Sequence, residues 1–143
     1  MSQTESQDLF GDAHVRRYRE TGGEVGHIWK NGSTILLLTT IGRKSGEPRT
    51  HALIYGTDDS GTLALVASKG GAPEHPAWYL NLVDQPTVEI ELLDEKFSAE
   101  ARTADETERA YWWPIMTAQW PDYDSYQAST DRQIPVVLIE RAD

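Results

Sequence analysis

Short strand-like segments joined by turns constrain the fold of this chain most. Apolar and β-branched residues fill positions 34–40, a pattern typical of a strand buried on both faces. A second strand-like segment ends at Asp58-Asp59-Ser60-Gly61, a hairpin turn in which Gly61 can adopt a positive φ. This second segment is 50–57, and the remaining four are 62–68, 87–93, 96–103 and 135–140. Hairpin connections between them predict a small α+β fold: a six-stranded, mainly antiparallel barrel with short peripheral helices.

The length of the chain suits one compact domain. It has 143 residues, of which 38% are hydrophobic, and this is too short for two domains. An N-terminal helix or arm is expected within residues 1–24, because residues 5–20 contain few helix breakers and end at Thr21-Gly22-Gly23. We therefore predict that residues 1–143 form a single domain, in which residues 25–143 build the barrel and the arm covers one mouth.

Two further helices are expected after the third strand. Pro76 occupies the position that proline prefers at a helix start, so a short helix is predicted from there to about Val83. Thr103-Ala104-Asp105-Glu106 has the pattern of a capping box and predicts a helix that runs to about Ala118. Residues 119–132 are aromatic and polar and are expected to form a loop with a helical turn.

The composition excludes several classes of function. With 13 Lys and Arg against 23 Asp and Glu, the formal charge of −10 argues against duplex nucleic acid as a partner. The chain has no cysteine and its four histidines are scattered, so neither thiolate chemistry nor a metal site is expected. The chain has no apolar run long enough to span a bilayer, and its polar N-terminus is unlike a signal peptide; together these predict a cytoplasmic protein.

A basic loop stands out on this acidic chain. Arg43, Lys44 and Arg49 place three cations within seven consecutive positions of the segment 43–51. Such a concentration of positive charge is costly unless an anion sits there, so the loop indicates a small-anion site. The alternative is a solvated turn whose cations pair with nearby carboxylates such as Glu47.

A second loop, Ser68-Lys69-Gly70-Gly71, follows a strand and precedes a helix start. Its glycines allow close approach of backbone amides to an anion, and Lys69 adds a positive charge. If the first three strands form a meander, this loop and the basic loop emerge at the same end of the sheet and face one another. The alternative is an ordinary turn that uses glycine for backbone reasons.

Aromatic residues offer walls for a ligand. Six of them gather in residues 111–126: Tyr111, Trp112, Trp113, Trp120, Tyr123 and Tyr126. Pro114 and Pro121 interrupt this segment, which leaves the last three aromatics suited to a lid over an apolar or aromatic ligand, or to a hydrophobic plug of the barrel. Trp78 could line a pocket for a planar ring and Asn81 could bond the edge of a heterocycle, or both could be structural. His51 could donate a proton, or could be structural.

Three motifs in order carry a resemblance to a known family. They are Leu-Leu-Thr-Thr-Ile-Gly-Arg-Lys-Ser-Gly-Glu-Pro-Arg (37–49), Val-Ala-Ser-Lys-Gly-Gly-Ala (66–72) and His-Pro-Ala-Trp-Tyr-Leu-Asn-Leu (75–82). The chain resembles the deazaflavin-dependent nitroreductases, which belong to the split β-barrel flavin and deazaflavin oxidoreductases and occur chiefly in mycobacteria and related actinobacteria. The likeness covers roughly residues 25–140, so the predicted barrel becomes a split β-barrel.

The resemblance implies that the anion is part of coenzyme F420, an 8-hydroxy-5-deazaflavin with a phosphate and a polyglutamate tail. The positions that match the family's cofactor-binding motifs are Arg43, Lys44, Ser45, Arg49, Thr50, His51, Ala52, Leu53, Ile54, Val66, Ala67, Ser68, Lys69, Ala77, Trp78, Tyr79, Leu80, Asn81 and Tyr123. The positions that match its substrate wall are Tyr55, Trp120, Tyr123 and Tyr126. Trp120 stands where the family often has a tyrosine, which leaves open whether nitroimidazoles are accepted.

The function implied by the resemblance is that of an F420-dependent oxidoreductase. It would transfer a hydride from the reduced deazaflavin to a quinone, a nitroaromatic or nitroimidazole compound, or an activated enone, with the cofactor supplying the reactivity. The proton would come from solvent or from one of two tentative catalytic residues, Tyr123 and Ser68. Two alternatives stay open: a non-catalytic protein that binds deazaflavin or an apolar ligand such as a fatty acid, and an FMN-dependent oxidoreductase on the same barrel. Peripheral membrane association and a monomeric or homodimeric state are further expectations.

Overall fold

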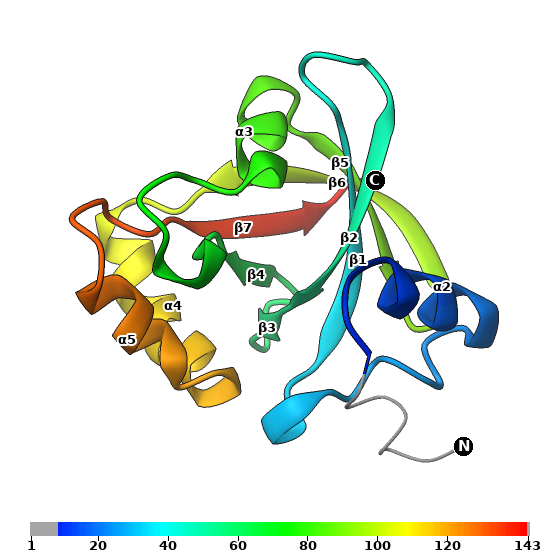
Figure 1. Ribbon diagram of the computed structural model, residues 1–143, viewed down its shortest axis with the longest axis horizontal. Helices are drawn as coiled ribbons and strands as arrows, with labels where there is room; N and C mark the ends of the chain where they lie inside the picture. Colours follow the sequence, from blue (N-terminus) through cyan, green and yellow to red (C-terminus); the bar gives the residue numbers. More distant parts are fainter. Residues whose placement is uncertain (1–8, 143) are drawn as a thin grey trace.

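A curled antiparallel sheet forms the centre of the computed structural model, which describes residues 9–142 (Figure 1). Its seven strands lie in the order β2-β1-β5-β6-β7-β4-β3, and neighbouring strands are antiparallel. The strands are β1 (Ile35–Ile41), β2 (Pro48–Ile54), β3 (Gly56–Thr57), β4 (Leu63–Val66), β5 (Thr87–Leu92), β6 (Glu95–Thr103) and β7 (Val136–Arg141). The predicted α+β class with an antiparallel, curled sheet is confirmed, whereas the predicted number of six strands is wrong.

The additional strand comes from a break at Tyr55 in the predicted strand 50–57. Before the break, β2 pairs with β1; after it, Gly56 pairs with Ala64 of β4. At the break, the backbone N–H of Tyr55 donates to the carbonyl oxygen of Thr34 at 3.0 Å. The first three strands therefore do not form a simple meander. Instead, β2 and β3 occupy the two edges of the sheet, and their covalent connection brings these edges together.

The apolar run that begins β1 is buried on both faces, as its sequence predicts. Leu36 and Leu38 point into the main core inside the curl, where they meet inward residues of β4 to β7. Ile35 and Leu37 point the other way and pack with Tyr18 of α2 (Gly11–Thr21). This alternation follows from the two-residue period of a strand. It also shows that α2 covers the outer face of the sheet.

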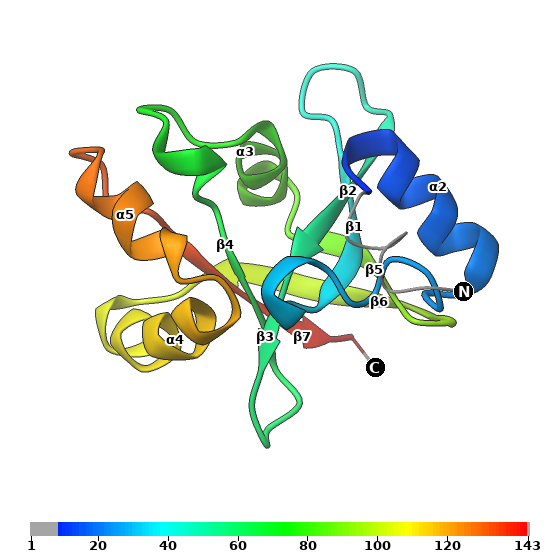
Figure 2. The same ribbon diagram turned by 60° about the horizontal axis from the view of Figure 1, so that its bottom comes forward.

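The remaining helices are α3 (Ala77–Asp84), α4 (Glu106–Gln119) and α5 (Asp122–Ala128), with 3-10 turns η1 (Lys30–Gly32) and η2 (Lys69–Gly71). Helix α2 overlaps the predicted N-terminal helix 5–20 and ends one residue later, at Thr21. Residues 5–8 of the prediction lie outside the described part of the chain. Pro76 precedes α3 as its N-cap instead of being its first residue. Figure 2 shows α2 and α5 on opposite sides of the molecule, with β2 and β4 between them.

The predicted capping box lies two residues further along the chain than expected. Asp105 caps α4: its side chain accepts from the N–H of Glu108 at 2.8 Å, and Glu108 Oε1 accepts from the N–H of Asp105 at 3.0 Å. Thr103, the predicted cap, is still paired with Val137 in the sheet. It therefore cannot begin the helix.

Candidate functional site

A cavity of about 430 Å³ opens where β2 and β4 diverge, a size typical of small-molecule sites. Four parts of the fold line it: β2, the end of β4 with η2, the segment from α4 to α5, and the N-terminal segment around α2 and η1. Trp78 of α3, which is buried, completes the wall. The cavity thus brings together segments that are far apart in the sequence.

All five residues 50–54 of β2 line the cavity. Five consecutive residues of a strand can do so because β2 is an edge strand, with one side of its backbone unpaired. Thr50 is fixed by its hydroxyl, which lies 2.8 Å from Thr39 Oγ1 and accepts from Arg19 Nη2 at 3.1 Å. The Nδ1 atom of His51 is buried and has no hydrogen-bond partner among residues 9–142. Burial also lowers the pKa of His51, so its ring is a neutral group that can bind a ligand.

The end of β4 and η2 contribute Val66, Ser68, Lys69 and Gly70 to the cavity. Ser68 is buried, and its hydroxyl makes no hydrogen bond within the described part of the chain. Lys69 has a φ of 47° and Gly70 one of 64°, a left-handed turn that is unusual for a lysine. The Lys69 ammonium pairs with Glu74 at 3.1 Å, and both side chains are about half exposed (48% and 62%). Such an exposed pair is weak, so Lys69 can exchange its partner for an anionic ligand.

Arg132 holds the loop that carries Ser68 and Lys69. Its guanidinium donates to the carbonyl oxygens of Ser68 at 2.7 Å, Ala72 at 2.9 Å and Ala67 at 3.2 Å. Arg132 Nη1 also lies 3.0 Å from His75 Nδ1. Burial, and the positive charge of Arg132, lower the pKa of His75, which agrees with a neutral ring that accepts this hydrogen bond.

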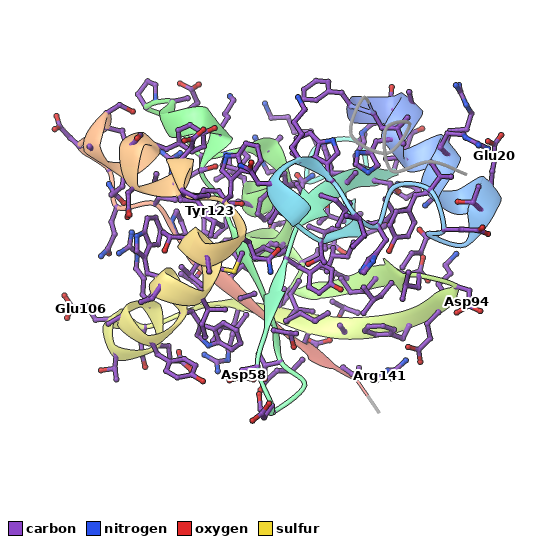
Figure 3. All side chains as sticks on the ribbon, turned by 90° about the horizontal axis from the view of Figure 1, so that it is seen from below. Glu20, Asp58, Asp94, Glu106, Tyr123 and Arg141 are labelled. Carbon is purple, nitrogen blue, oxygen red and sulfur yellow. The ribbon has the colours of Figure 1, made fainter. Side chains whose placement is uncertain are left out.

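Trp120, Tyr123 and Tyr126 form the aromatic wall on the α5 side. Tyr123 is buried, and burial raises the pKa of its phenol, which stays protonated at neutral pH. Its hydroxyl makes no hydrogen bond within residues 9–142, so it is available to a ligand. Figure 3, which labels Tyr123, shows this residue where α5 faces the centre of the molecule. All three predicted residues therefore line the cavity, and their role as a wall for a ligand stays a prediction.

The N-terminal segment forms a further wall of the cavity. The sequence predicted that an N-terminal helix covers one mouth of the barrel, but it predicted no site residue in this segment. Its lining residues include Phe10, His14, Val15 and Trp29. His14 is buried and bonds the carbonyl oxygen of Gly26 at 2.8 Å through Nε2. The one local signal was Trp29 itself, a large aromatic side chain between Gly26 and Gly32.

Several predicted site residues lie outside the cavity lining. Tyr55 belongs to the main core, and its hydroxyl lies 2.9 Å from His27 Nε2. Ala67 is buried in the same core, and the hydroxyl of Tyr79 lies 2.7 Å from Thr103 Oγ1. Ala77, Leu80 and Asn81 also lie outside the lining, so Trp78 is the one residue of 77–81 that reaches the cavity.

The basic loop does not meet Lys69 in one cavity, contrary to the expected two-sided anion site. Arg43 donates to Asn81 Oδ1 through its backbone N–H at 3.2 Å and through Nη1 at 3.1 Å, which holds the loop against α3. A groove between α2 and β2 adjoins the cavity and shares lining residues 50 and 51 with it, and Arg49 lines this groove. Neither the cavity nor the groove is lined by Arg43, Lys44 or Ser45.

Comparison with known proteins decides which family has this site. The sequence model described as F420H(2)-dependent quinone reductase matches residues 12–141. The chain belongs to this family. An F420H(2)-dependent quinone reductase of Mycobacterium tuberculosis is 39% identical over 131 residues, which cover 90% of this chain and 87% of the relative.

Two solved structures are similar to this member of the F420H(2)-dependent quinone reductase family. An F420-H2 dependent reductase, FDR-A, is 42% identical with a TM-score of 0.68, over 74% of this chain and 93% of that chain. A structure described as a domain-swapped dimer is 37% identical with a TM-score of 0.71, over 88% of this chain and 92% of that chain. The resemblance read from the sequence motifs is therefore confirmed.

The cavity fits the cofactor of the family, coenzyme F420. A flat deazaflavin ring needs apolar and aromatic walls, which β2, Trp78 and Tyr126 supply. Its polar edge needs hydrogen-bond partners, and His51 Nδ1 is without a partner in the described part of the chain. Among residues 9–142, no helix is both long and apolar enough to cross a bilayer.

Proposed function

We propose that the protein oxidises reduced F420 and reduces a quinone, with both rings held in the cavity between β2 and α5. The observation that carries this proposal is the cavity itself, which combines aromatic walls with two hydroxyls that lack partners within the described residues, those of Ser68 and Tyr123. When bound, F420 supplies the hydride. The protein holds the two rings in contact and excludes water from them, which are large contributions to such a transfer.

Binding of the anionic part of the cofactor falls to Lys69 and Arg49. Lys69 lies in the cavity wall and Arg49 in the adjoining groove. Each pairs with an exposed glutamate, Glu74 at 3.1 Å and Glu47 at 3.7 Å, and such pairs stabilise the fold little. A phosphate or carboxylate of the cofactor can therefore replace these partners at low cost. Arg43, Lys44 and Ser45 would contact only the outer part of a long tail.

Two hydroxyls can stabilise the acceptor as negative charge develops on its oxygen. The phenol of Tyr123 stays protonated because burial raises its pKa, so it donates a hydrogen bond without ionising. Ser68 supplies a second donor from the end of β4, next to η2, where the cavity wall adjoins α5. We expect the proton to reach the acceptor oxygen through one of these hydroxyls. Nitro compounds and activated enones, which are also flat acceptors, stay predictions, as do peripheral membrane association and the oligomeric state.

Cofactor titration and turnover test the proposal together. Fluorescence titration of the purified protein with F420 and with FMN should show binding of F420 and little or no binding of FMN. Addition of menadione to the protein with reduced F420 should then oxidise the cofactor. Tight FMN binding without a response to F420 would contradict the cofactor assignment. F420 binding without oxidation by any quinone would instead indicate a binding protein.

A further inference from the structure

Trp29 and Trp120 stack on one another in the wall of the cavity. Their ring centroids are 5.5 Å apart and their planes differ by 17°, and both side chains line the cavity. Trp29 lies just before η1, whereas Trp120 directly follows α4 as its C-cap, so the stack joins two segments that are far apart in the sequence. Figure 2 shows the segment around η1, in light blue, beside the end of α4.

Hydrogen bonds hold both segments and both indoles in place. Gln119 Oε1 accepts from the backbone N–H of Thr34 at 3.0 Å and from its hydroxyl at 3.3 Å. Trp29 Nε1 donates to the carbonyl oxygen of Leu9 at 3.0 Å, and Trp120 Nε1 donates to the hydroxyl of Tyr126 at 3.2 Å. Because both indole N–H groups are used in this way, the pair offers a ligand mainly apolar ring surface.

The surroundings of the stack favour a neutral, flat ligand. Lys30 Nζ lies 5.3 Å from the centroid of the Trp29 ring, an attraction between a cation and an electron-rich ring. The lysine of the cavity lining, Lys69, belongs to η2, on a different wall. Arg49, the other cation assigned to the anionic part of the cofactor, lines the groove between α2 and β2, which Trp29 does not line. The wall at Trp29 is therefore left for the other reactant. Quinones are flat, neutral and electron-poor, and such rings stack well on indoles.

We propose that Trp29 is a specificity-determining residue of the acceptor site. Together with Trp120 it forms the apolar surface on which the quinone ring packs, and its indole limits how far a bulky acceptor extends toward η1. This inference rests on the proposed quinone reductase function, and its test separates the two. If none of the quinones tested oxidises reduced F420 in the presence of the wild-type protein, both proposals are wrong.

The test compares Trp29→Ala and Trp29→Phe with the wild-type protein. For menadione, Trp29→Ala should raise KM about tenfold, equivalent to about 1.4 kcal/mol of binding free energy. Its kcat and its affinity for F420, measured by fluorescence titration, should change less than about twofold, because neither depends on this wall. Trp29→Phe keeps a flat ring and should recover most of the menadione KM. For a quinone with a bulky side group, Trp29→Ala should raise KM less than it does for menadione, because the shortened side chain makes room for the bulky group.

Trp113→Phe is the matched control. Like Trp29, Trp113 is a half-buried tryptophan, and it belongs to the aromatic segment 111–126. Its N–H donates to Asp124 Oδ1 at 2.7 Å, but it does not line the cavity. This variant should keep the menadione KM. Unchanged KM values for all quinones in folded Trp29→Ala would overturn the proposal, as would an equal loss of F420 affinity, which would place Trp29 in the cofactor site. Should Trp29→Ala not fold, Trp29→Leu removes the flat ring while keeping apolar volume and gives the same readout.

Discussion

The guanidinium of Arg132 donates to the carbonyl oxygen of Ser68 at 2.7 Å, across 64 positions of the chain. Two further carbonyl oxygens of the same loop, those of Ala67 and Ala72, bind the same side chain. A loop with few hydrogen bonds of its own is thereby fixed by a single residue from the segment before β7. The position of Ser68 and Lys69 in the cavity depends on it.

Replacement of Arg132 by lysine should loosen this loop. A lysine cannot reproduce the planar arrangement of donors, so at least one carbonyl loses its partner, at a cost of about 1–3 kcal/mol in the free energy of unfolding. Urea unfolding should show this loss, and F420 titration should show weaker binding. Arg141→Lys is the control, because Arg141 pairs with Glu95, both side chains are about half exposed, and such a pair should tolerate the change. Equal stability of the two variants would contradict the role of Arg132.

Removal of Lys69 or Arg49 should weaken F420 binding. Each of the variants Lys69→Ala and Arg49→Ala loses one charged hydrogen-bond donor for the anionic part of the cofactor, which corresponds to about tenfold in Kd. The loss should shrink as salt is added, because added ions screen exposed charges. Lys96→Ala controls for net charge, since Lys96 pairs with Glu89 on the sheet and lines neither cavity nor groove. An unchanged Kd at low salt would show that Lys69 and Arg49 do not hold the cofactor.

Gly71→Ala should disturb the aromatic wall as well as the backbone. Gly71 has a φ of 86°, and a Cβ there would lie 2.9 Å from the carbonyl oxygen and 3.0 Å from the Cα of Tyr126. We expect displacement of α5, a loss of about 1–3 kcal/mol in stability and weaker F420 binding. Gly46→Ala is the matched control, because Gly46 has a φ of 73° but no atom near the added Cβ. If both variants lose the same stability, the contact with α5 contributes nothing.

Stability should fall as the pH drops below about 6.5, the pKa of an unperturbed histidine. Burial lowers the pKa of His14 in the folded protein, and His27 and His51 shift in the same direction for the same reason. Below pH 6.5 the unfolded chain therefore binds protons that the folded protein does not, at up to about 1.4 kcal/mol per pH unit for each histidine. Urea unfolding between pH 5.5 and 7.5 measures the slope, and His14→Gln should make it shallower. A slope that does not change in the variant would rule out a contribution from His14.

Tyr123→Phe should lower kcat more than it weakens cofactor binding. The variant removes a buried hydrogen-bond donor to the acceptor oxygen, and the loss of one such donor costs about 100- to 1,000-fold in kcat. Because burial raises the pKa of Tyr123, the wild-type rate should show no loss from its ionisation up to about pH 9. Stopped-flow oxidation of reduced F420 by menadione measures both quantities. Comparison with Ser68→Ala then shows which hydroxyl contributes more.

Local sequence patterns predicted the elements of this fold better than their connections. The apolar run 34–40 predicted a strand buried on both faces. In the structure, its side chains alternate between the main core and α2. The break at Tyr55 could not be predicted, because residues on both sides of it have strand character. What changes there is the partner strand, from β1 to β4, and such pairing depends on residues far along the chain.

The candidate site shows the same division. The cavity lining includes residues 50–54, Ser68, Lys69 and Trp78, which the motifs place relative to strand ends. Their predicted role in binding the cofactor stays a prediction. Asn81 has the right chemistry for a ligand contact, yet its amide binds Thr40 and Arg43. A sequence shows which groups a side chain carries but not which neighbour uses them. Trp29 was not predicted as a site residue, because its neighbours in the sequence form no recognisable motif.

The position of β7 has a consequence for how the protein comes to bind its ligand. Strand β7 pairs with β6 on one side and with β4 on the other, although it follows both in the sequence. During synthesis from the N-terminus, the β3–β4 hairpin therefore has no place in the sheet until residues 136–141 have emerged from the ribosome. The cavity needs walls from both β2 and β4, so it forms only when this last strand joins. Cofactor binding should then be a late event in folding, and fluorescence of bound F420 should report complete folding rather than early collapse.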